Sequence, residues 1–324
     1  MKSIIGMVCC LNESEFLDDF FKHNLRLVDK MIVATGAVIG YPFATPDGHS
    51  IDDTNKILNK WEQEYPDKIV IIKIDRKWKS KQSQQNSMLK YVNDGDWCFI
   101  FGADEFYMPD TRKRIEKVLE KYPNATEITW PTIHFFNDNK HLIVNSEFNT
   151  HKMIRREQRF FKYEASFRWV NHPTINNMYR NVDTFFDFKY AETKINLGMS
   201  HKFDKYQYRD DLCGVWDYDD NNIINRYHYG FIRNISARIR KHIYYLMRDR
   251  NFSMMDAIDF ISDKTNNNFK TLFGYINQIH QTRDVGIGKF IGKHPLSYRK
   301  FNNSVVDLND LKEEYKDFNE KPVK

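Results

Sequence analysis

Residues 96–106, with the sequence Asp-Trp-Cys-Phe-Ile-Phe-Gly-Ala-Asp-Glu-Phe, decide the fold of this chain. The part from Trp97 to Phe101 is fully apolar, as expected of a strand buried on both faces. Two adjacent carboxylates, Asp104 and Glu105, follow the strand at its C-terminal end. Ligands of open α/β sheets bind at this edge, and carboxylates there suit a hard divalent cation and the phosphates that it carries. A strand followed by a plain acidic turn is the alternative, so the surrounding residues must decide.

The segment before this stretch alternates apolar strands with amphipathic helices. Repeated units of this kind, with continuously apolar strands, predict an α/β fold with a mostly parallel, Rossmann-like sheet flanked by helices. Asn12 and Glu15 form a capping-box signature at the start of the first helix. The predicted strands are 4–10, 30–35, 69–74 and 97–101, and two further helices are predicted at 54–64 and 80–92.

The pattern changes after residue 125. Residues 127–136 and 159–170 are rich in aromatic and β-branched side chains, which predicts antiparallel or mixed strands. From Ile232 onward, apolar residues recur at helical spacing. We therefore predict a catalytic and nucleotide-binding domain over residues 1–230 and a helical C-terminal region over residues 231–324.

Composition narrows the class of protein. The chain has 324 residues, 41% of them hydrophobic, and a net charge of +5, which fits a protein that handles anionic phosphates. Its four cysteines show no metal-binding spacing, so a reduced, cytoplasmic setting is predicted. No apolar segment approaches the roughly 20 residues that span a bilayer, so the sequence predicts no transmembrane segment.

Four short segments follow one another in the chain: Cys10-Leu11-Asn12-Glu13-Ser14, Ser50-Ile51-Asp52-Asp53-Thr54, Gln84-Gln85-Asn86 and Gly102-Ala103-Asp104-Glu105-Phe106. In this order they resemble the motifs of the family 2 glycosyltransferases of the GT-A fold. A fainter likeness, to phage and bacterial members, lies in Arg226-Tyr227-His228-Tyr229-Gly230-Phe231-Ile232-Arg233.

The resemblance implies a metal-assisted hexosyl- or pentosyltransferase that uses a nucleoside-diphosphate sugar, UDP-linked, with Mn²⁺ or Mg²⁺. A metal and nearby cations would stabilise the charge that grows on the leaving diphosphate. By resemblance, Asp104 and His228 would bind the metal, and Asp104, Arg233 and His172 would be the catalytic residues. The implied nucleotide-binding residues are Leu11, Asn12, Glu13, Asp52, Asn86 and Ala103.

Several of these residues also have purely structural interpretations. Asp52 is an acceptable helix N-cap, Asn86 is suited to holding a neighbouring loop, and His228 is suited to a hydrogen-bonded place in the core. His201 competes with His228 for the role of metal ligand.

The chain departs from the family pattern at three points. Gly102 stands where a first aspartate is usual, so we expect Gly102→Asp to tighten metal or donor binding if the site is otherwise standard. The second strand ends in Ala34-Thr35-Gly36, without the common aspartate, and Pro173 follows His172 where a glutamate base is expected. The candidates that remain for the catalytic base are Asp183, Asp187, Glu192 and Asp210.

The predicted reaction inverts the sugar, and the acceptor is a glycan, a protein or a modified DNA base. The basic residues between Arg233 and Arg250 are either a solvated helix face or a nucleic-acid contact. A degenerate transferase that binds nucleotide sugar or glycan without turnover is one alternative. A nucleotidyltransferase is another, although residues 11–15 are acidic and lack the glycines of a phosphate loop.

Overall fold

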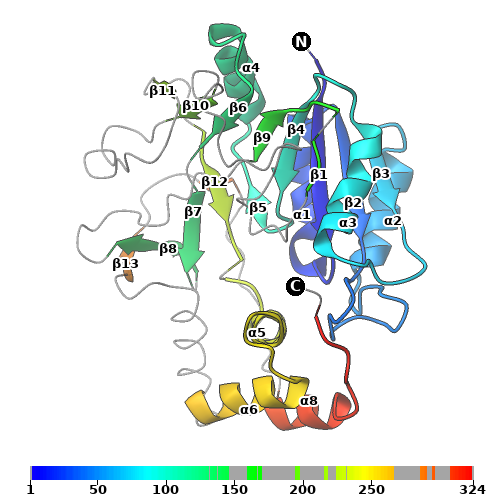
Figure 1. The fold of residues 1–324 in the computed structure, drawn as a ribbon. Helices are drawn as coiled ribbons and strands as arrows, with labels where there is room; N and C mark the ends of the chain where they lie inside the picture. The colour runs from blue at the N-terminus through cyan, green and yellow to red at the C-terminus, as the bar shows by residue number, and fades with distance from the viewer. Residues whose placement is uncertain are drawn as a thin grey trace.

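The computed structural model describes residues 2–130, 132–136, 138–145, 159–165, 167–169, 194–197, 215–217, 224–230, 232–265, 285–289, 294–295 and 307–322. Its centre is an eight-stranded sheet, drawn in Figure 1, with the strand order β11-β10-β6-β9-β4-β1-β2-β3. Strands β3, β2, β1 and β4 run parallel to one another, and β9 is antiparallel to both β4 and β6. The strands are β1 Ile4–Cys10, β2 Lys30–Thr35, β3 Ile69–Ile72, β4 Trp97–Phe101, β6 Glu127–Thr129, β9 Phe160–Lys162, β10 Lys194–Leu197 and β11 Val215–Asp217.

Helices cover both faces of this sheet because the central strands are apolar on both faces. Along β1, Ile4 and Val8 pack in one core with residues of α1, α2 and α4, while Ile5 and Met7 pack in another core with residues that follow α3. The predicted α/β class with a mostly parallel sheet is therefore confirmed. The helices are α1 Ser14–Asn24, α2 Thr54–Glu64, α3 Lys81–Asn86 and α4 Thr111–Lys121.

A second sheet, with the order β13-β8-β7-β12-β5, carries distant segments to the end of β4. Its strand β12 pairs with β5 on one side and with β7 on the other. This pairing places His228 opposite Glu105 and His134, although the three residues are far apart in the sequence. The strands are β5 Glu105–Phe106, β7 Thr132–Phe136, β8 Asp138–Asn145, β12 Arg226–His228 and β13 Val285–Lys289.

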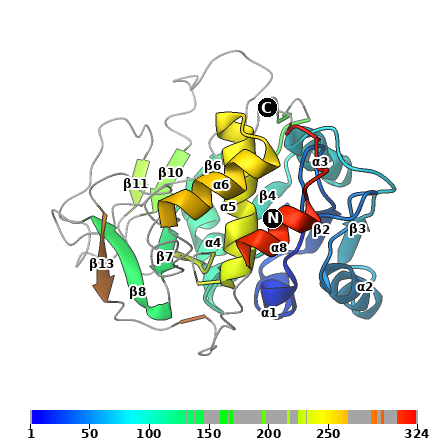
Figure 2. The ribbon, with the colours of Figure 1, turned by 90° about the horizontal axis from the view of Figure 1, so that it is seen from below.

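Three C-terminal helices pack around a second hydrophobic core, and Figure 2 shows these helices from below. Helix α5 spans Ile235–Arg250, α6 spans Met254–Thr265, and α8 spans Leu308–Glu314. Phe43, from the loop after β2, is fully buried among them. Within the described part of the chain, no helix is both long enough and apolar enough to cross a bilayer.

Two local predictions are wrong. Asn12 does not cap α1, because its side chain donates to the carbonyl of Phe43 (2.6 Å) and accepts from the amide of Ile51 (3.0 Å). The predicted helix 80–92 divides, because α3 ends at Asn86 and residues 87–91 form a 3₁₀ helix.

Asp18 joins α1 to α2 and provides a test of this packing. Its carboxylate accepts from Trp61 Nε1 (2.9 Å) and Lys60 Nζ (3.1 Å). A hydrogen bond from Lys22, together with these two, lowers the pKa of Asp18 to about 2.

We expect Asp18→Asn to lower the free energy of unfolding by about 1–2 kcal/mol at neutral pH, since the hydrogen bonds from Lys60 and Trp61 to a charged group are weakened. A depressed pKa stabilises the folded state above the unfolded pKa, and this stabilisation is lost as the pH falls through the folded pKa. In urea titrations the difference in the free energy of unfolding between the variant and the wild type should therefore narrow as the pH falls from 3.8, the ordinary pKa of an aspartate, to about 2, the pKa of Asp18 in the folded protein. A deficit that is constant over this range would contradict the assignment.

Candidate active site

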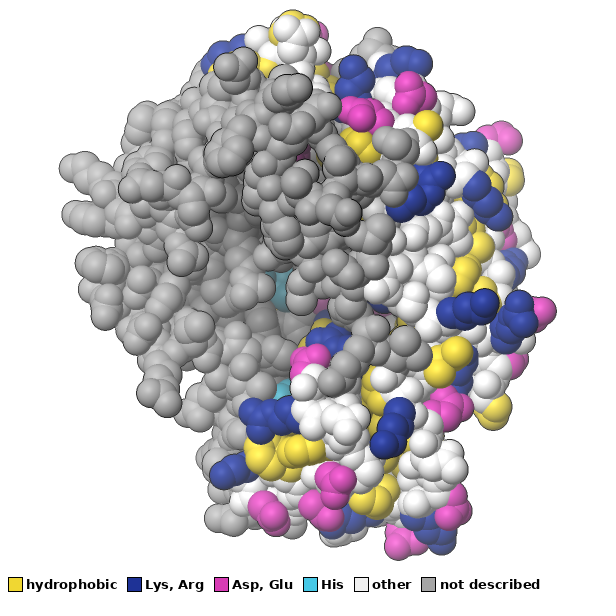
Figure 3. Space-filling view, viewed as in Figure 1, with side chains coloured by type: hydrophobic (Ala, Val, Ile, Leu, Met, Phe, Trp, Pro, Cys, Tyr) yellow, Lys and Arg dark blue, Asp and Glu magenta, His cyan; other side chains and the backbone are white. Residues whose placement is uncertain are grey.

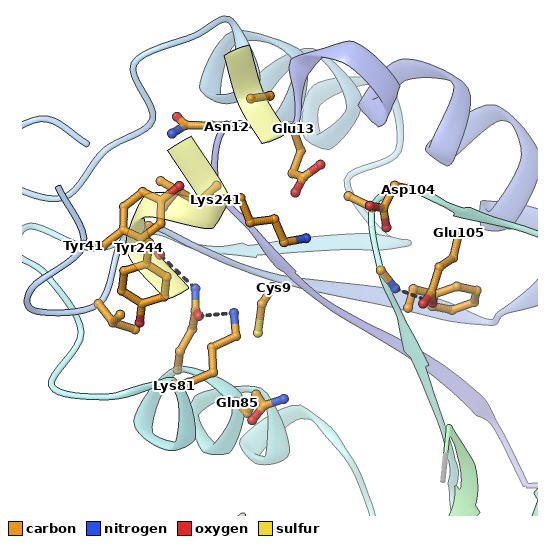
Figure 4. Close-up of a pocket in the computed structure, with 18 of the residues that line it drawn as sticks. Cys9, Asn12, Glu13, Tyr41, Lys81, Gln85, Asp104, Glu105, Lys241 and Tyr244 are labelled. Carbon is orange, nitrogen blue, oxygen red and sulfur yellow. Dashed lines mark hydrogen bonds between the residues drawn. The ribbon is translucent and has the colours of Figure 1, made fainter. Parts of the chain in front are cut away.

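A cavity of about 450 Å³ opens at the C-terminal ends of β1 and β4. Figure 4 shows Lys241 of α5 reaching between the Asp104 end of the cavity and an end formed by Tyr41, Tyr244 and α3. Strand ends on one side and α5 on the other thus enclose one site. Because ligands of parallel sheets bind at this edge, the cavity is the candidate active site.

Asp104 and His228 form a pair of potential metal ligands at one end of the cavity. Asp104 Oδ2 lies 3.7 Å from His228 Nε2. A Cβ atom added at Gly230 would lie only 2.6 Å from His228 Nε2 and 2.7 Å from Asp104 Oδ2, so the glycine keeps the space in front of both atoms open. Two ligands, each about 2.1 Å from one ion, can span such a gap. The residues present therefore fit a divalent metal.

The second ring nitrogen of His228 is held by another histidine. Nδ1 of His228 lies 2.8 Å from Nδ1 of His134, so one of these two nitrogens donates and the other accepts. When His228 is the donor, the lone pair of its Nε2 faces Asp104, which is the tautomer that a metal requires. Among the described residues, no group of three or more histidine, cysteine, aspartate or glutamate side chains could hold a metal ion.

The charge states at this end favour an anionic Asp104 and a neutral His228. Burial raises the pKa of Asp104, but protonated His228 and the cations Arg233 and Lys241 outweigh it and lower that pKa well below its usual range. Burial lowers the pKa of His228, against the opposing effect of Asp104. The directions of these two pKa shifts leave Asp104 ionised and His228 neutral near pH 7.

Glu105 has a structural role beside this pair. Its carboxylate accepts from the amide of Gly102 (2.7 Å) and from Arg159 Nη2 (3.0 Å), and Arg226 Nε lies 3.7 Å away. Glu105 is 3% exposed, so its charge is balanced by the two arginines inside the protein. It fixes the turn that presents Asp104.

We expect Gly102→Asp to weaken the site, although the family pattern alone predicts tighter binding. A Cβ atom at position 102 would lie 2.9 Å from Asp104 Oδ1 and 3.0 Å from Cδ of Glu105, which Arg159 holds in place. Overpacking of this kind costs about 1–3 kcal/mol. Urea unfolding and Mn²⁺ titration would measure both effects, with Gly102→Ala as the purely steric control. Tighter Mn²⁺ binding by Gly102→Asp would restore the original expectation.

Glu13 and Arg233 form a largely buried ion pair in the cavity lining, with 16% and 5% of their side chains exposed. The two terminal guanidinium nitrogens of Arg233, Nη1 and Nη2, face the Glu13 carboxylate, and the guanidinium carbon lies 5.4 Å from the centre of the Phe16 ring. Glu15 also accepts from the amide of Asn234 at the start of α5. The start of α1 is thereby joined to the start of α5, which closes the cavity.

Lys241 supplies a cation to the middle of the cavity. The structure gives its ammonium no hydrogen bond or ion pair among the described residues, and Figure 4 shows it extending between Glu13 and Asp104. Tyr245 and Asp104 raise its pKa, so Lys241 is charged at neutral pH. An exposed, charged and unpaired amine of this kind is suited to an anionic ligand.

The other end of the cavity is polar and aromatic. Lys81 donates to Gln84 Oε1 (2.8 Å), while the buried Oε1 atom of Gln85 has no partner among the described residues. The ring centres of Tyr41 and Tyr244 lie 4.9 Å apart. An unsatisfied buried acceptor in the cavity lining indicates a place for a ligand that can donate a hydrogen bond.

The structure brings most of the predicted site residues together. Asp52 both lines the cavity and serves the fold, because it accepts from the amide and hydroxyl of Ser14 and from the amide of Thr54. Asn86 does not line the cavity, since its amide is paired with both backbone groups of Trp169. Other predicted residues that line it are Leu11, Asn12, Glu13, Ala103, Asp104, His228 and Arg233.

Other predicted residues fall outside the described residues, so the structure does not place them. They are the predicted catalytic residue His172, its neighbour Pro173, the alternative ligand His201, and the candidate bases Asp183, Asp187, Glu192 and Asp210.

The basic run of α5 is divided between the core and the cavity. Arg238 and His242 of α5 are buried, Arg240 and Lys241 line the cavity, and Arg233, just before α5, is both buried and part of the lining. On the face seen in Figure 3, basic and acidic side chains of the described residues are interspersed. Contact between this run and nucleic acid stays a prediction, and three of its residues are too buried to take part.

Residues 43–180 match the family model described as glycosyl transferase family 2. The matched region includes the segments around Asp52, Gln85 and Asp104, and it confirms the predicted resemblance and the enzyme class, a glycosyltransferase. No curated protein matches the chain.

Several solved structures share limited similarity with the chain. The S. aureus protein TarS, in complex with UDP-GlcNAc, is 14% identical with a TM-score of 0.29, over 42% of this chain and 34% of that one. The mannosyltransferase PcManGT of Pyrobaculum calidifontis, in complex with GDP-Man and Mn²⁺, is 12% identical with a TM-score of 0.39, over 86% of this chain and 71% of that one. The chain covers less than half of each TarS structure that it matches.

Proposed function

We propose, from the match of residues 43–180 to glycosyl transferase family 2, that this protein transfers a sugar from a nucleoside-diphosphate sugar to an acceptor hydroxyl. One observation carries the proposal. The Asp104–His228 pair and the unpaired ammonium of Lys241 converge on one cavity, beside a polar end that offers a hydrogen-bond acceptor. Residues of the proposed 1–230 domain and of α5, in the proposed 231–324 region, build this cavity together.

Asp104 and His228 would hold a divalent Mn²⁺ or Mg²⁺ ion. When bound, the ion supplies positive charge next to the leaving diphosphate. The chain's own cations would act on the same charge, with Lys241 in direct reach of the ligand and Arg233 behind it, paired with Glu13. Groups placed where charge develops lower the barrier more than they strengthen binding of the donor.

The polar end would receive the nucleobase. Uracil presents an N–H donor between two carbonyl acceptors, and the unpaired Gln85 oxygen can accept from such a donor. Tyr41 and Tyr244, in the same cavity lining, supply flat apolar surface. We therefore propose a UDP-linked donor, with the base near α3 and the sugar near Asp104.

An acceptor hydroxyl would attack the anomeric carbon opposite the departing diphosphate, which inverts the configuration at that carbon. His172 remains a proposed catalytic residue, and the candidates for the catalytic base remain Asp183, Asp187, Glu192 and Asp210. The acceptor classes are a glycan, a protein and a modified DNA base, and the sugar is a hexose or a pentose.

A panel of UDP- and GDP-sugars, each with and without Mn²⁺, tests the function directly. A transferase hydrolyses its own donor slowly without acceptor, so we expect Mn²⁺-dependent release of UDP from one member of the panel. Acceptor arms with oligosaccharide, protein and DNA then identify the acceptor, and only the DNA arm should weaken steeply with salt. Donor binding without release would indicate a non-catalytic binding protein, which the glycine at position 102 favours as the second candidate.

A further inference from the structure

The last described residues of the chain pack against the loop that forms one wall of the cavity. Figure 1 shows this tail rising from α8 toward the loops below the sheet. The Glu320 carboxylate accepts from the amide of Gly40 (3.2 Å) and from Lys77 Nζ (2.7 Å and 2.8 Å to its two oxygens). One side chain of the tail therefore contacts two separate segments of the α/β core.

These two segments are paired with each other at the cavity wall. Val38 and Trp78 form a parallel bridge, in which Ile39 donates to the Trp78 carbonyl (2.9 Å) and Trp78 donates to the Ala37 carbonyl (2.8 Å). The first segment carries Val38 and Tyr41 into the cavity lining, and the second leads into α3. Glu320 binds both segments one or two residues from the bridge.

The contact with the tail requires a glycine at position 40. Its φ of +78° lies in the left-handed region, and a Cβ atom there would lie 2.3 Å from backbone atoms of Lys321 and Pro322. Glycine is thus required both by the backbone conformation and by the close approach of the tail.

The same loop is fixed on its other side by aromatic packing. The ring centre of Phe43 lies 5.9 Å from that of Tyr41 and 5.3 Å from that of Tyr315, which directly follows α8. The Phe43 carbonyl accepts from Asn12 at the end of β1. The loop is therefore held between the strand ends and the C-terminal helices, and Glu320 is the charged part of that attachment.

We propose that Glu320 is a positioning residue for the donor pocket. Its carboxylate clamps residues 37–41 to residues 77–78 and so fixes the wall of the cavity that carries Tyr41. The effect on donor binding rests on the function proposed above, whereas the effect on the loop does not. Lys77 has 11% of its side chain exposed and Glu320 has 44%, so the lysine is held against the protein while solvent reaches the pair from the glutamate.

The test combines one binding readout with one readout that needs no ligand. For Glu320→Gln, we expect UDP in the presence of Mn²⁺ to bind about threefold to tenfold more weakly, as for the loss of one charged hydrogen bond. Turnover at saturating donor should stay unchanged, because Glu320 does not reach the reacting atoms. Hydrogen exchange at the Gly40 amide, measured without nucleotide, should become faster.

Further variants separate the clamp from general stability. Lys77→Gln should have the same effect, and the double variant should be no worse than either single variant, because both changes break one interaction. Deletion of residues 319–324 should weaken UDP binding at least as much. Glu313→Gln, whose side chain is 81% exposed on α8, is the matched control and should change neither readout.

Unchanged UDP affinity together with unchanged exchange at Gly40 in Glu320→Gln would overturn the proposal, and so would lower turnover with unchanged affinity. A third outcome is that the wild type binds no UDP while Glu320→Gln still shows faster hydrogen exchange at Gly40. That outcome would support the clamp on the loop and would reject the proposed UDP-linked donor.

Discussion

Replacing Asp104 with asparagine is expected to lower sugar transfer at least about a hundredfold, because loss of one charged group that stabilises the departing diphosphate costs about 3–4 kcal/mol. The substitution keeps the volume of the side chain and removes the charge that faces His228, 3.7 Å away. The fold should persist, since the Asp104 carbonyl still accepts from the amide of Tyr229 and Glu105 still holds the turn.

Mn²⁺ titration followed by isothermal calorimetry gives the direct readout, and thermal unfolding reports the fold. Asp53→Asn is a suitable control, because Asp53 is exposed next to the cavity without lining it. Near-normal activity of Asp104→Asn in saturating Mn²⁺ would remove Asp104 from the metal site.

The parallel core was predictable because each of its strands is a continuous apolar run between polar turns. The predicted bounds of β1, β2, β4 and α2 agree with the structure, since their hydrophobic periods are unambiguous. The start of α1 was not predictable in the same way. The pattern of Asn12 and Glu15 is a local capping signal, but Asn12 bonds to a loop some thirty residues away and Glu15 bonds to the start of α5. Both side chains therefore bond to residues distant in the sequence and do not form the local capping box.

For the cavity residues too, sequence patterns alone did not show which side chains the tertiary fold brings together. Asp104 and His228 were indicated by short motifs, whereas Lys241, Gln85 and Tyr41 were not assigned to the site. Lys241 belongs to a basic run whose members look alike in sequence, and only the orientation of α5 separates buried Arg238 from cavity-lining Lys241. Helical spacing offered a partial signal, because residues 237, 240, 241 and 244 share one helix face.

The Glu13–Arg233 pair also has two roles that sequence reasoning did not distinguish. Arg233 was expected to neutralise the diphosphate, yet the structure pairs it with Glu13 inside the protein, where its side chain is 5% exposed. Burial raises the pKa of Glu13, and Arg233 opposes that effect. The arginine therefore stabilises the folded protein as well as facing the cavity.

Arg233→Met should consequently lower both stability and turnover. Removing one partner of a buried ion pair costs about 3–5 kcal/mol, because Glu13 is left as an uncompensated buried charge beside Asp104. Methionine keeps the apolar contact with Phe16, so the loss would reflect charge rather than volume. Urea unfolding should show this loss, and turnover at saturating donor should fall about a hundredfold if Arg233 acts on the transition state.

The double variant Glu13→Gln with Arg233→Met separates the two effects. It removes both charges, so most of the lost free energy of unfolding should return. Turnover per folded molecule should stay low, because no cation replaces Arg233 next to the diphosphate. Donor affinity should change less than turnover, since the arginine acts on charge that grows during the reaction. If stability and turnover recover together in the double variant, Arg233 only balances Glu13, and Lys241 is left as the chain's cation for the leaving diphosphate.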